Sequence, residues 1–349
     1  MRPAKHVFLT GAGFTKNFGG YLGAEMWSVI FSQKEIGRRT ELRNHLLKTL
    51  DYEDAYNSVL YSDQLSNTEK EEFTEAVKKA YQQLHQAICA PSEMKKKHQA
   101  HAFCKAFVSR FAGEGDRRGF IFTLNQDLFL EQFYLQSYSH DCPRIPGLGH
   151  PNWFQGRLGE TLQAADWIVL PSQEKVDKLA ADFWNSRGEH FVYVKLHGSY
   201  GWRTSGNSDV GNSDVMVIGS EKRGLIEGEP ILRWFFSLFE QVLYQGGCDL
   251  VVIGYGFRDA HINKLINTAI EKYGLRLHVI SPQLPSDFRN LLAPVHLMLP
   301  GRNPFTPEGD TLWQGLHGYY CNSIFDFVRD DTQTLTPLGE AFFDRLWVN

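Results

Sequence analysis

The chain has 349 residues, 42% of them hydrophobic and 22% charged, which is the composition of a globular protein with a substantial core. Its 36 basic and 40 acidic residues give a net charge of −4, a balance that predicts no binding to nucleic acid or to a membrane surface. The five cysteines are scattered and form no Cys-x-x-Cys pair, which argues for a reducing compartment and against a four-cysteine zinc site. The sequence contains neither a signal peptide nor an apolar run long enough for a membrane span, so we expect a cytoplasmic protein.

The first predicted element is a short buried strand, Val7–Leu9, which ends in a Gly-Ala-Gly turn at positions 11–13. Glycines in such a turn let the backbone approach a bound group closely. A helix that starts near Thr15 would point its first N–H groups at a phosphate. However, the dinucleotide pattern Gly-x-Gly-x-x-Gly needs a glycine where Lys16 stands. This stretch alone leaves an ordinary strand-to-helix turn and a phosphate site as alternatives.

A helical insertion is predicted between about residues 38 and 115, where strand signals disappear. Apolar residues recur there at spacings of three and four, and Thr68 with Glu71 forms a candidate capping box. The predicted helices of this part of the chain are Ala24–Phe31, which continues the first helix, and then Glu41–Leu50, Thr68–Ile88 and Glu93–Phe111.

Strands alternate with helices in the remainder of the chain. The predicted strands are Gly119–Thr123, Trp167–Leu170, His190–Leu196, Asp249–Ile253, Leu275–Ile280 and Val295–Leu299. The predicted helices are Leu128–Tyr138, Pro230–Tyr244, Ile262–Tyr273, Thr311–Phe327 and Pro337–Trp347. Long loops are expected at 139–159 and from the glycine after His197 to about Gly228. This alternation predicts an α/β fold with a parallel sheet covered by helices on both faces, forming a single domain over residues 1–349. Helices over 300–349 are a candidate assembly surface.

Four polar or glycine-rich clusters each follow a predicted strand directly. They are Gly11–Thr15, Thr123–Asp127, His197–Ser199 and Gly254–Asp259. Because ligands of parallel α/β sheets bind beyond the carboxyl ends of the strands, we expect these four clusters to form one site.

Each polar residue of these clusters also has a purely structural interpretation. Asn125 and Asp127 alternate just past a strand and could point to the same side, but Asp127 could simply cap the next helix, as could Asp259. His197 could act as a general base, although a lone histidine at a strand end is more often structural. His98 and His101 are one helical turn apart with no third ligand nearby, so no metal site is predicted.

Together, the four motifs resemble those of the sirtuin-like family, and more closely the bacterial sirtuin-like NADases of anti-phage defence. The resemblance runs from the amino terminus to about Pro282. It implies a Rossmann-like NAD-binding fold in which His197 is the catalytic histidine, with Asn125 and Asp127 beside the nicotinamide and its ribose. The residues that it places around the rest of NAD are Gly11, Ala12, Gly13, Phe14, Thr15, Thr123, Gly254, Tyr255, Asp259 and Ser281.

The departures from the family favour NAD cleavage over protein deacylation. Deacylating sirtuins carry Gly-x-Pro-Asp-Phe-Arg soon after the first motif, where this chain reads Gly-Gly-Tyr-Leu-Gly-Ala at 19–24, and a four-cysteine zinc module that this chain cannot build. The resemblance therefore implies hydrolysis of NAD+, as substrate, to ADP-ribose and nicotinamide, without a metal. Because such activity endangers its host, it also implies gating, through homo-oligomers or a partner such as a HerA-type ATPase or another infection sensor.

Three alternatives stay open. A sensor that binds NAD or ADP-ribose without cleaving it would need neither Asn125 nor His197. A protein deacylase lacks its zinc module here. A dehydrogenase would need the third glycine and an acidic residue after a second strand, where the helical insertion begins instead.

Overall fold

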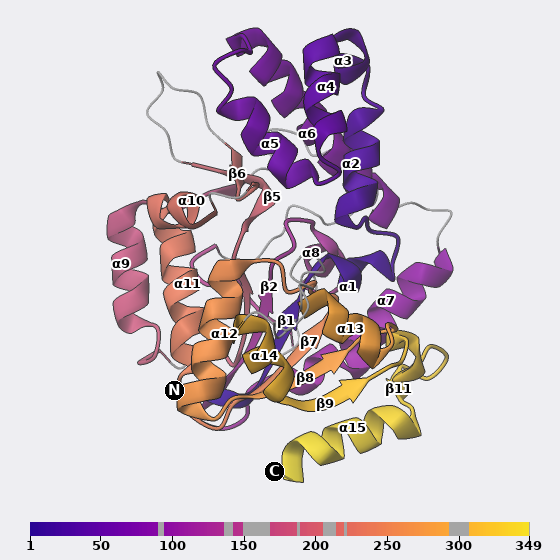
Figure 1. The fold of residues 1–349 in the computed structure, drawn as a ribbon. Helices are drawn as coiled ribbons and strands as arrows, with labels where there is room; N and C mark the ends of the chain where they lie inside the picture. The colour runs from indigo at the N-terminus through magenta and orange to yellow at the C-terminus, as the bar shows by residue number, and fades with distance from the viewer. Residues whose placement is uncertain are drawn as a thin grey trace.

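A six-stranded parallel sheet forms the centre of the computed structural model, with the strand order β4-β2-β1-β7-β8-β9 (Figure 1). The structure describes residues 1–89, 94–135, 142–148, 168–186, 189–204, 214–219, 222–292 and 307–348. The strands of the sheet are β1 (Arg2–Thr10), β2 (Arg117–Thr123), β4 (Phe191–Lys195), β7 (Asp249–Ile253), β8 (Arg276–Ile280) and β9 (Leu316–Tyr320). All residues of β4 and β7 are buried, as expected of strands with both faces covered.

Helices cover both faces of this sheet, which confirms the predicted α/β Rossmann-like class. On one face, Phe122 of β2 packs against Phe239 of α11 (Pro230–Leu243), with ring centroids 4.7 Å apart. Leu9 pairs with Phe122 in register, so its neighbour Phe8 points to the other face. There Phe8 stacks on Phe111, at 5.0 Å, in the short 3-10 helix Val108–Phe111.

The strand order reverses between β1 and β7. From β1 the chain adds β2 and β4 on one side, and from β7 it adds β8 and β9 on the other. The connections after β1 and β7 therefore diverge to opposite sides, so the carboxyl ends of these two strands form the topological switch point at which ligands of such sheets bind. Helix α1 (Ala12–Lys16) begins there, within the first glycine turn, and α12 (Ala260–Tyr273) follows β7.

A lobe of helices follows α1 and stands over one end of the sheet (Figure 1). It consists of α2 (Gly23–Phe31), α3 (Lys34–Arg38), α4 (Thr40–Lys48), α5 (Tyr52–Leu60) and α6 (Asn67–Cys89), and α7 (Met94–Ala106) then returns to the sheet. Helices α3 and α5 were not predicted from the sequence. Helix α2 packs on α5 and α6, so it belongs to this helical lobe rather than to the first helix. Tyr81 of α6 donates a hydrogen bond to the side chain of Gln126, which places the helical lobe against the carboxyl end of β2.

The predicted capping box of α6 is wrong by two residues. The helix begins at Asn67, and the reciprocal bonds are made by Ser66 and Glu69: the Ser66 N–H donates to Glu69 Oε2 (2.9 Å) and the Glu69 N–H to Ser66 Oγ (3.3 Å). Thr68 lies inside the first turn instead.

The predicted helix Thr311–Phe327 is wrong over most of its length. Helix α14 (Pro307–Gln314) ends just before Gly315. A Cβ at Gly315 would lie 2.4 Å from Cδ1 of Ile270. The chain then forms β9, which pairs with β8, followed by the 3-10 helix Ile324–Asp326 and the hairpin of β10 (Val328–Arg329) and β11 (Thr334–Leu335). The predicted final helix is confirmed as α15 (Pro337–Val348).

The predicted loop after His197 is also wrong, because it contains regular structure. It forms β5 (Gly198–Arg203), β6 (Asp214–Met216) and α10 (Lys222–Gly228), and β5 joins β3 (Ile168–Val169) and β6 in a second sheet. Helix α9 (Gln173–Asp182), which was not predicted, packs on α11. The helix predicted from Leu128 is α8 (Phe129–Phe133), while its last residues and the strand predicted at 295–299 lie outside the described residues.

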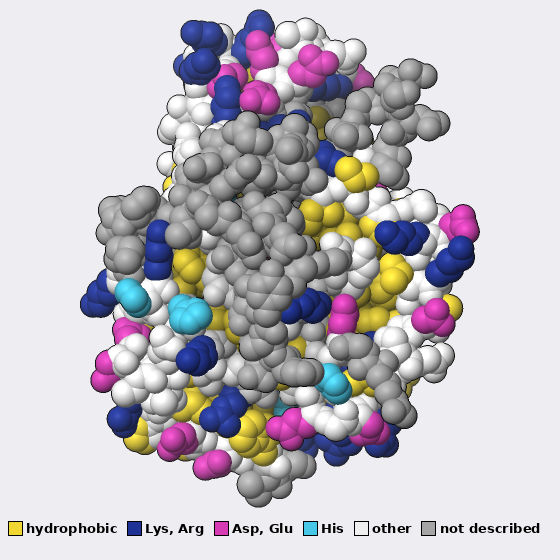
Figure 2. Space-filling model, turned by 180° about the vertical axis from the view of Figure 1, so that it is seen from behind, with side chains coloured by type: hydrophobic (Ala, Val, Ile, Leu, Met, Phe, Trp, Pro, Cys, Tyr) yellow, Lys and Arg dark blue, Asp and Glu magenta, His cyan; other side chains and the backbone are white. Residues whose placement is uncertain are grey.

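Acidic and basic side chains are interspersed on the face shown in Figure 2, in line with the net charge of −4. Among the described residues, no helix combines the length and hydrophobicity that crossing a bilayer requires.

A buried carboxylate, Asp249, lies at the amino end of β7, opposite the predicted site. It accepts hydrogen bonds from Arg276 (2.7 and 2.5 Å) and from His278 (3.0 Å), and His6 Nδ1 lies 3.2 Å away. Burial alone would raise the pKa of Asp249, but the hydrogen bonds from Arg276 and His278, together with the nearby His6, outweigh it and hold the pKa far below its usual range.

This depressed pKa predicts a loss of stability in acid. Asp249 stabilises the folded chain fully above the unfolded-state pKa of about 3.9, and that contribution declines as the pH falls below this value. We expect the urea midpoint of the wild type to fall between about pH 5 and pH 2 more steeply than that of Asp249→Asn, which lacks the titrating group. Parallel pH profiles for the two proteins would contradict this assignment.

Candidate functional site

The two glycine turns meet at the carboxyl ends of β1 and β7. The N–H of Gly11 donates to the carbonyl of Ile253 (3.1 Å), and the N–H of Gly13 donates to the carbonyl of Gly254 (2.9 Å). A Cβ on Gly11 would lie 2.6 Å from the Gly254 oxygen, and one on Gly13 would lie 2.8 Å from the Gly254 Cα. The first turn therefore needs glycines for the close approach of two backbones.

Gly254 has the strictest requirement of these positions. Its φ is +70°, and a Cβ there would lie 2.0 Å from the backbone nitrogen of Phe14. We expect Gly254→Ala to destabilise the protein by at least about 1–3 kcal/mol from backbone strain alone, with the clash adding to this. Gly224→Ala, in helix α10, would place its methyl group where no atom lies within 4 Å, so the thermal midpoint should stay unchanged or rise slightly. Equal midpoints for the two variants would contradict the packing of the turns.

Asn125 and Thr123 connect the second motif to the first. Thr123 Oγ1 accepts hydrogen bonds from the Thr10 hydroxyl (2.8 Å) and from the Asn125 N–H (3.0 Å). The Asn125 side-chain amide donates to the carbonyl of Gly11 (2.9 Å) and lies 3.4 Å from Thr15 Oγ1. The two predicted motifs thus share one buried hydrogen-bond network.

Asp127 combines the capping role with a contact to the first motif. One carboxylate oxygen accepts from the Phe129 N–H (3.0 Å) at the start of α8, and the other accepts from the Thr15 hydroxyl (2.9 Å). Burial raises the pKa of Asp127, against the opposing effects of Lys195, Phe129 and Thr15. The carboxylate therefore bridges α1 and the start of α8.

A buried ion pair under Asp127 was not predicted. Lys195 Nζ lies 2.8 Å from Glu131 Oε1, both side chains have no exposed surface, and Lys195 also donates to the Asp127 carbonyl. The Tyr193 hydroxyl donates to the second Glu131 oxygen (3.3 Å). The available signal was a lysine at the end of the otherwise apolar strand β4, because a buried lysine requires an acidic partner.

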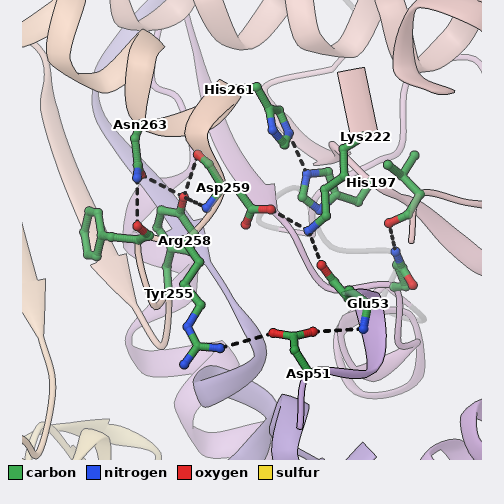
Figure 3. Close-up of polar contacts among 12 residues, drawn as sticks. Asp51, Glu53, His197, Lys222, Tyr255, Arg258, Asp259, His261 and Asn263 are labelled. Atoms are coloured by element: carbon green, nitrogen blue, oxygen red, sulfur yellow. Dashed lines mark hydrogen bonds and ion pairs between the residues drawn. The ribbon is translucent and has the colours of Figure 1, made fainter. Parts of the chain in front are cut away.

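His197 lies just past β4 and faces a second histidine, His261, from the first turn of α12 (Figure 3). Their Nε2 atoms are 3.0 Å apart. Burial lowers the pKa of His197 to about 3, and Lys222 and His261 act in the same direction against Asp259. His197 is therefore a neutral imidazole near pH 7, the protonation state that a general base requires.

Asp259 does not cap α12 with its side chain, contrary to the helix-cap interpretation. Its carboxylate instead binds Lys222 of α10 (2.5 Å), and the same ammonium binds Glu53 of α5 (2.7 Å). Burial would raise the pKa of Asp259, but His197 and Lys222 outweigh it and lower this pKa. Lys222 and Glu53 were not predicted from the sequence, and neither lies in a motif.

Tyr255 lies just past the end of β7, and Ser281 lies just past the end of β8. The buried Tyr255 hydroxyl donates to Asn263 Oδ1 (2.8 Å), and the Asn263 amide donates to the Phe257 carbonyl (2.7 Å), which fixes the second glycine turn. Ser281 follows β8, where its N–H donates to the Tyr320 carbonyl (3.0 Å) on β9. Ser281 thus lies one strand further from β1 than the second glycine turn.

One group within the described ranges has ligand atoms spaced as a metal ion requires. The ligand atoms of His197, Asp259 and His261 lie within 4.8 Å of one another. The Lys222 ammonium bound to Asp259 opposes a second cation there. His98 and His101, the pair noted in the sequence, are exposed on α7. The expectation of a metal-free site stays a prediction.

Half of the chain, residues 119–296, matches the family model of the SIR2-like domain. The match includes the motifs after β2, β4 and β7 and begins beyond the glycine turn after β1. No curated protein shows significant similarity to the chain. Proteins with this domain use NAD+, and the parallel sheet with its topological switch point at β1 and β7 is consistent with an NAD-utilising enzyme. On the strength of this match, the chain belongs to the SIR2-like family.

Proposed function

We propose that the protein hydrolyses the nicotinamide N-glycosidic bond of NAD+ and releases nicotinamide and ADP-ribose. The observation that carries this proposal is the convergence of Asn125, Asp127 and the first glycine turn in one network at the strand ends. The neutral His197 stands past the neighbouring strand β4. A family that uses NAD+ supplies the ligand class.

This reaction requires few catalytic groups. In NAD+ the nicotinamide is a cationic pyridinium ring and leaves as a neutral molecule, so no acid is needed to protonate it. The site must stabilise an oxocarbenium-like ribose and position a water molecule. In our proposal, His197 accepts a proton from water or a ribose hydroxyl. Asn125 orients that water or the ribose hydroxyls, and Asp127 fixes the nicotinamide side. The turns at 11–15 and 254–255 receive the phosphates and the adenosine half, with Thr123, Asp259 and Ser281 around them.

Such an enzyme must be restrained until it is needed, because unrestrained hydrolysis would exhaust the NAD+ of its own cell. We propose a gated cytoplasmic effector that depletes NAD+ in anti-phage defence. Homo-oligomerisation, or a partner such as a HerA-type ATPase or another infection sensor, would provide the trigger. The helical lobe and the surface of the last fifty residues are the candidate contact regions, although α15 itself packs Phe342 and Phe343 onto Phe107 of the core.

A sensor that binds NAD+ or ADP-ribose without cleaving it is the second candidate. The side-chain hydrogen bonds of Asn125 and Asp127 hold the first glycine turn and the start of α8, and a binding module would also need these contacts. The protein deacylase is less well supported, because the chain cannot build the zinc module.

Free nicotinamide distinguishes the enzyme from the sensor. The purified protein is incubated with NAD+, alone and with the products of neighbouring genes, and nicotinamide is quantified by chromatography while NAD+ binding is measured by calorimetry. The enzyme predicts nicotinamide in at least one of these conditions, in amounts far above one equivalent per chain. Tight binding with no release in any condition would establish the sensor instead.

A further inference from the structure

The contact between His197 and His261 requires a proton on one of their two Nε2 atoms. Both Nε2 atoms lie in a single 3.0 Å hydrogen bond, so one must donate and the other must accept. A backbone hydrogen bond at Leu124 raises the pKa of His197, as donation from the imidazole to the Leu124 carbonyl does. Since Nε2 faces His261, that donor is Nδ1 of His197.

A neutral His197 with its proton on Nδ1 has only a lone pair at Nε2. His261 must then donate its Nε2 proton to His197. The lone pair of His197 that would remove a proton from water or a ribose hydroxyl is therefore already occupied. His261 is also the more exposed of the two rings, so it covers the Nε2 side of His197.

We propose that His261 is a positioning residue that caps Nε2 of His197 in the resting protein, and that the helical lobe holds this cap in place through Glu53, Lys222 and Asp259. The catalytic consequence of this inference rests on the proposed function, whereas the contact itself does not. Release of the cap would free His197 to accept a proton.

Three ion pairs link the amino end of α5 to residues 258 and 259, which directly precede α12 and its residue His261 (Figure 3). Asp51 caps α5 by accepting from the Glu53 N–H (2.9 Å) and lies 3.4 Å from Arg258. Glu53 binds Lys222, which in turn binds Asp259, the residue before α12. A displacement of α5 would therefore move residues 258 and 259, and His261 with them.

The groups around the two rings all bear on the charge of His197. Burial, Lys222 and His261 oppose the protonation of His197, whereas Asp259 favours it. The negative charge of Glu53 offsets the positive charge of Lys222. A metal ion shared by His197, His261 and Asp259 is the competing explanation for this cluster. It would need a lone pair from each imidazole and would place a cation beside Lys222, so the charges favour the hydrogen-bonded cap.

Histidine titration by ¹⁵N NMR tests the cap without any need for activity. Wild type, His261→Ala and the control His101→Ala, at an exposed position of α7, are compared across pH, with NAD+ cleavage measured in parallel. Removing His261 takes away a proton donor to Nε2 and admits water. We expect the His197 pKa to rise by at least one unit in His261→Ala only, which corresponds to a tenfold change in its proton affinity. Basal NAD+ cleavage near pH 7 is expected to rise at least tenfold.

The helical lobe is tested separately with Glu53→Gln, which keeps the size of the side chain and removes its charge. We expect a smaller rise in basal NAD+ cleavage than in His261→Ala, with the folded content by circular dichroism unchanged. Wild-type activity in Glu53→Gln would overturn the coupling to the lobe.

Other outcomes separate this inference from the proposed function. An unchanged His197 pKa in a folded His261→Ala protein would overturn the cap. So would stoichiometric binding of Zn²⁺ to the wild type that is lost in both His197→Ala and His261→Ala, measured by calorimetry. A raised His197 pKa with no NAD+ cleavage in any protein would retain the cap and reject the NADase.

Discussion

His197→Ala is expected to reduce the rate of NAD+ cleavage by roughly a hundred- to ten-thousand-fold, the usual effect of losing a general base. His197 is buried beyond the end of β4, and burial keeps it neutral near pH 7, so its imidazole can accept a proton. The loss should appear in kcat more than in KM, because proton transfer matters in the transition state rather than in substrate binding. Initial rates of nicotinamide release under activating conditions measure it.

A matched histidine variant separates this chemistry from a general disturbance. His101→Ala removes an imidazole from the exposed surface of α7 and should keep wild-type rates. Thermal midpoints of both variants establish that they fold. If a folded His197→Ala protein released nicotinamide at the wild-type rate, His197 would not be the base.

Lys195→Met is expected to destabilise the protein by about 3–5 kcal/mol, because it leaves the carboxylate of Glu131 buried without its partner. The two groups are 2.8 Å apart with no exposed surface. Burial raises the pKa of Glu131 and Lys195 opposes this, so loss of the lysine drives the carboxyl toward protonation. Urea unfolding near pH 7 measures the change.

Two comparisons make this prediction specific to burial. Lys178 and Glu174 form a pair of nearly the same length, 2.7 Å, but their side chains are 73% and 80% exposed, so Lys178→Met should change the urea midpoint little. Combining Lys195→Met with Glu131→Leu removes both charges and should recover much of the loss. A single Lys195→Met variant as stable as Lys178→Met would show that the buried pair is not required.

The central sheet could be predicted because its strands carry their own signal. Buried parallel strands such as β7 are continuous apolar runs, and each is followed by a turn rich in glycine or polar residues. The sixth strand, β9, carries glycine, histidine and tyrosines at the edge of the sheet, and only part of it is buried. Its sequence therefore lacks the apolar run, and its strand conformation depends on pairing with β8.

The polar partners of the site depend on tertiary contacts that no local pattern reports. Glu53 lies in the helical lobe and Lys222 in α10, and both reach Asp259 only because the chain folds the helical lobe over the strand ends. His261 could be noted from its position two residues after Asp259, but its bond to His197 could not. The first glycine turn could be located from the local sequence, whereas its contact with the Gly254 backbone is visible only in the structure.

The incomplete glycine pattern of the first turn has a physical explanation in this contact. Gly11 and Gly13 allow the turn to lie against Gly254, so the close approach that a third glycine provides elsewhere is not demanded at Lys16. Lys16 lies instead at the end of α1 and pairs with Glu25 of α2.

Hydrolysis of NAD+ in ¹⁸O-labelled water tests the central claim most directly. The wild type, under whichever condition releases nicotinamide, should yield ADP-ribose and nicotinamide in equal amounts, with one ¹⁸O atom on the ribose carbon that carried nicotinamide. His197→Ala should yield neither product at a comparable rate. Intact NAD+ recovered from a protein that binds it tightly, in every condition, would contradict the account.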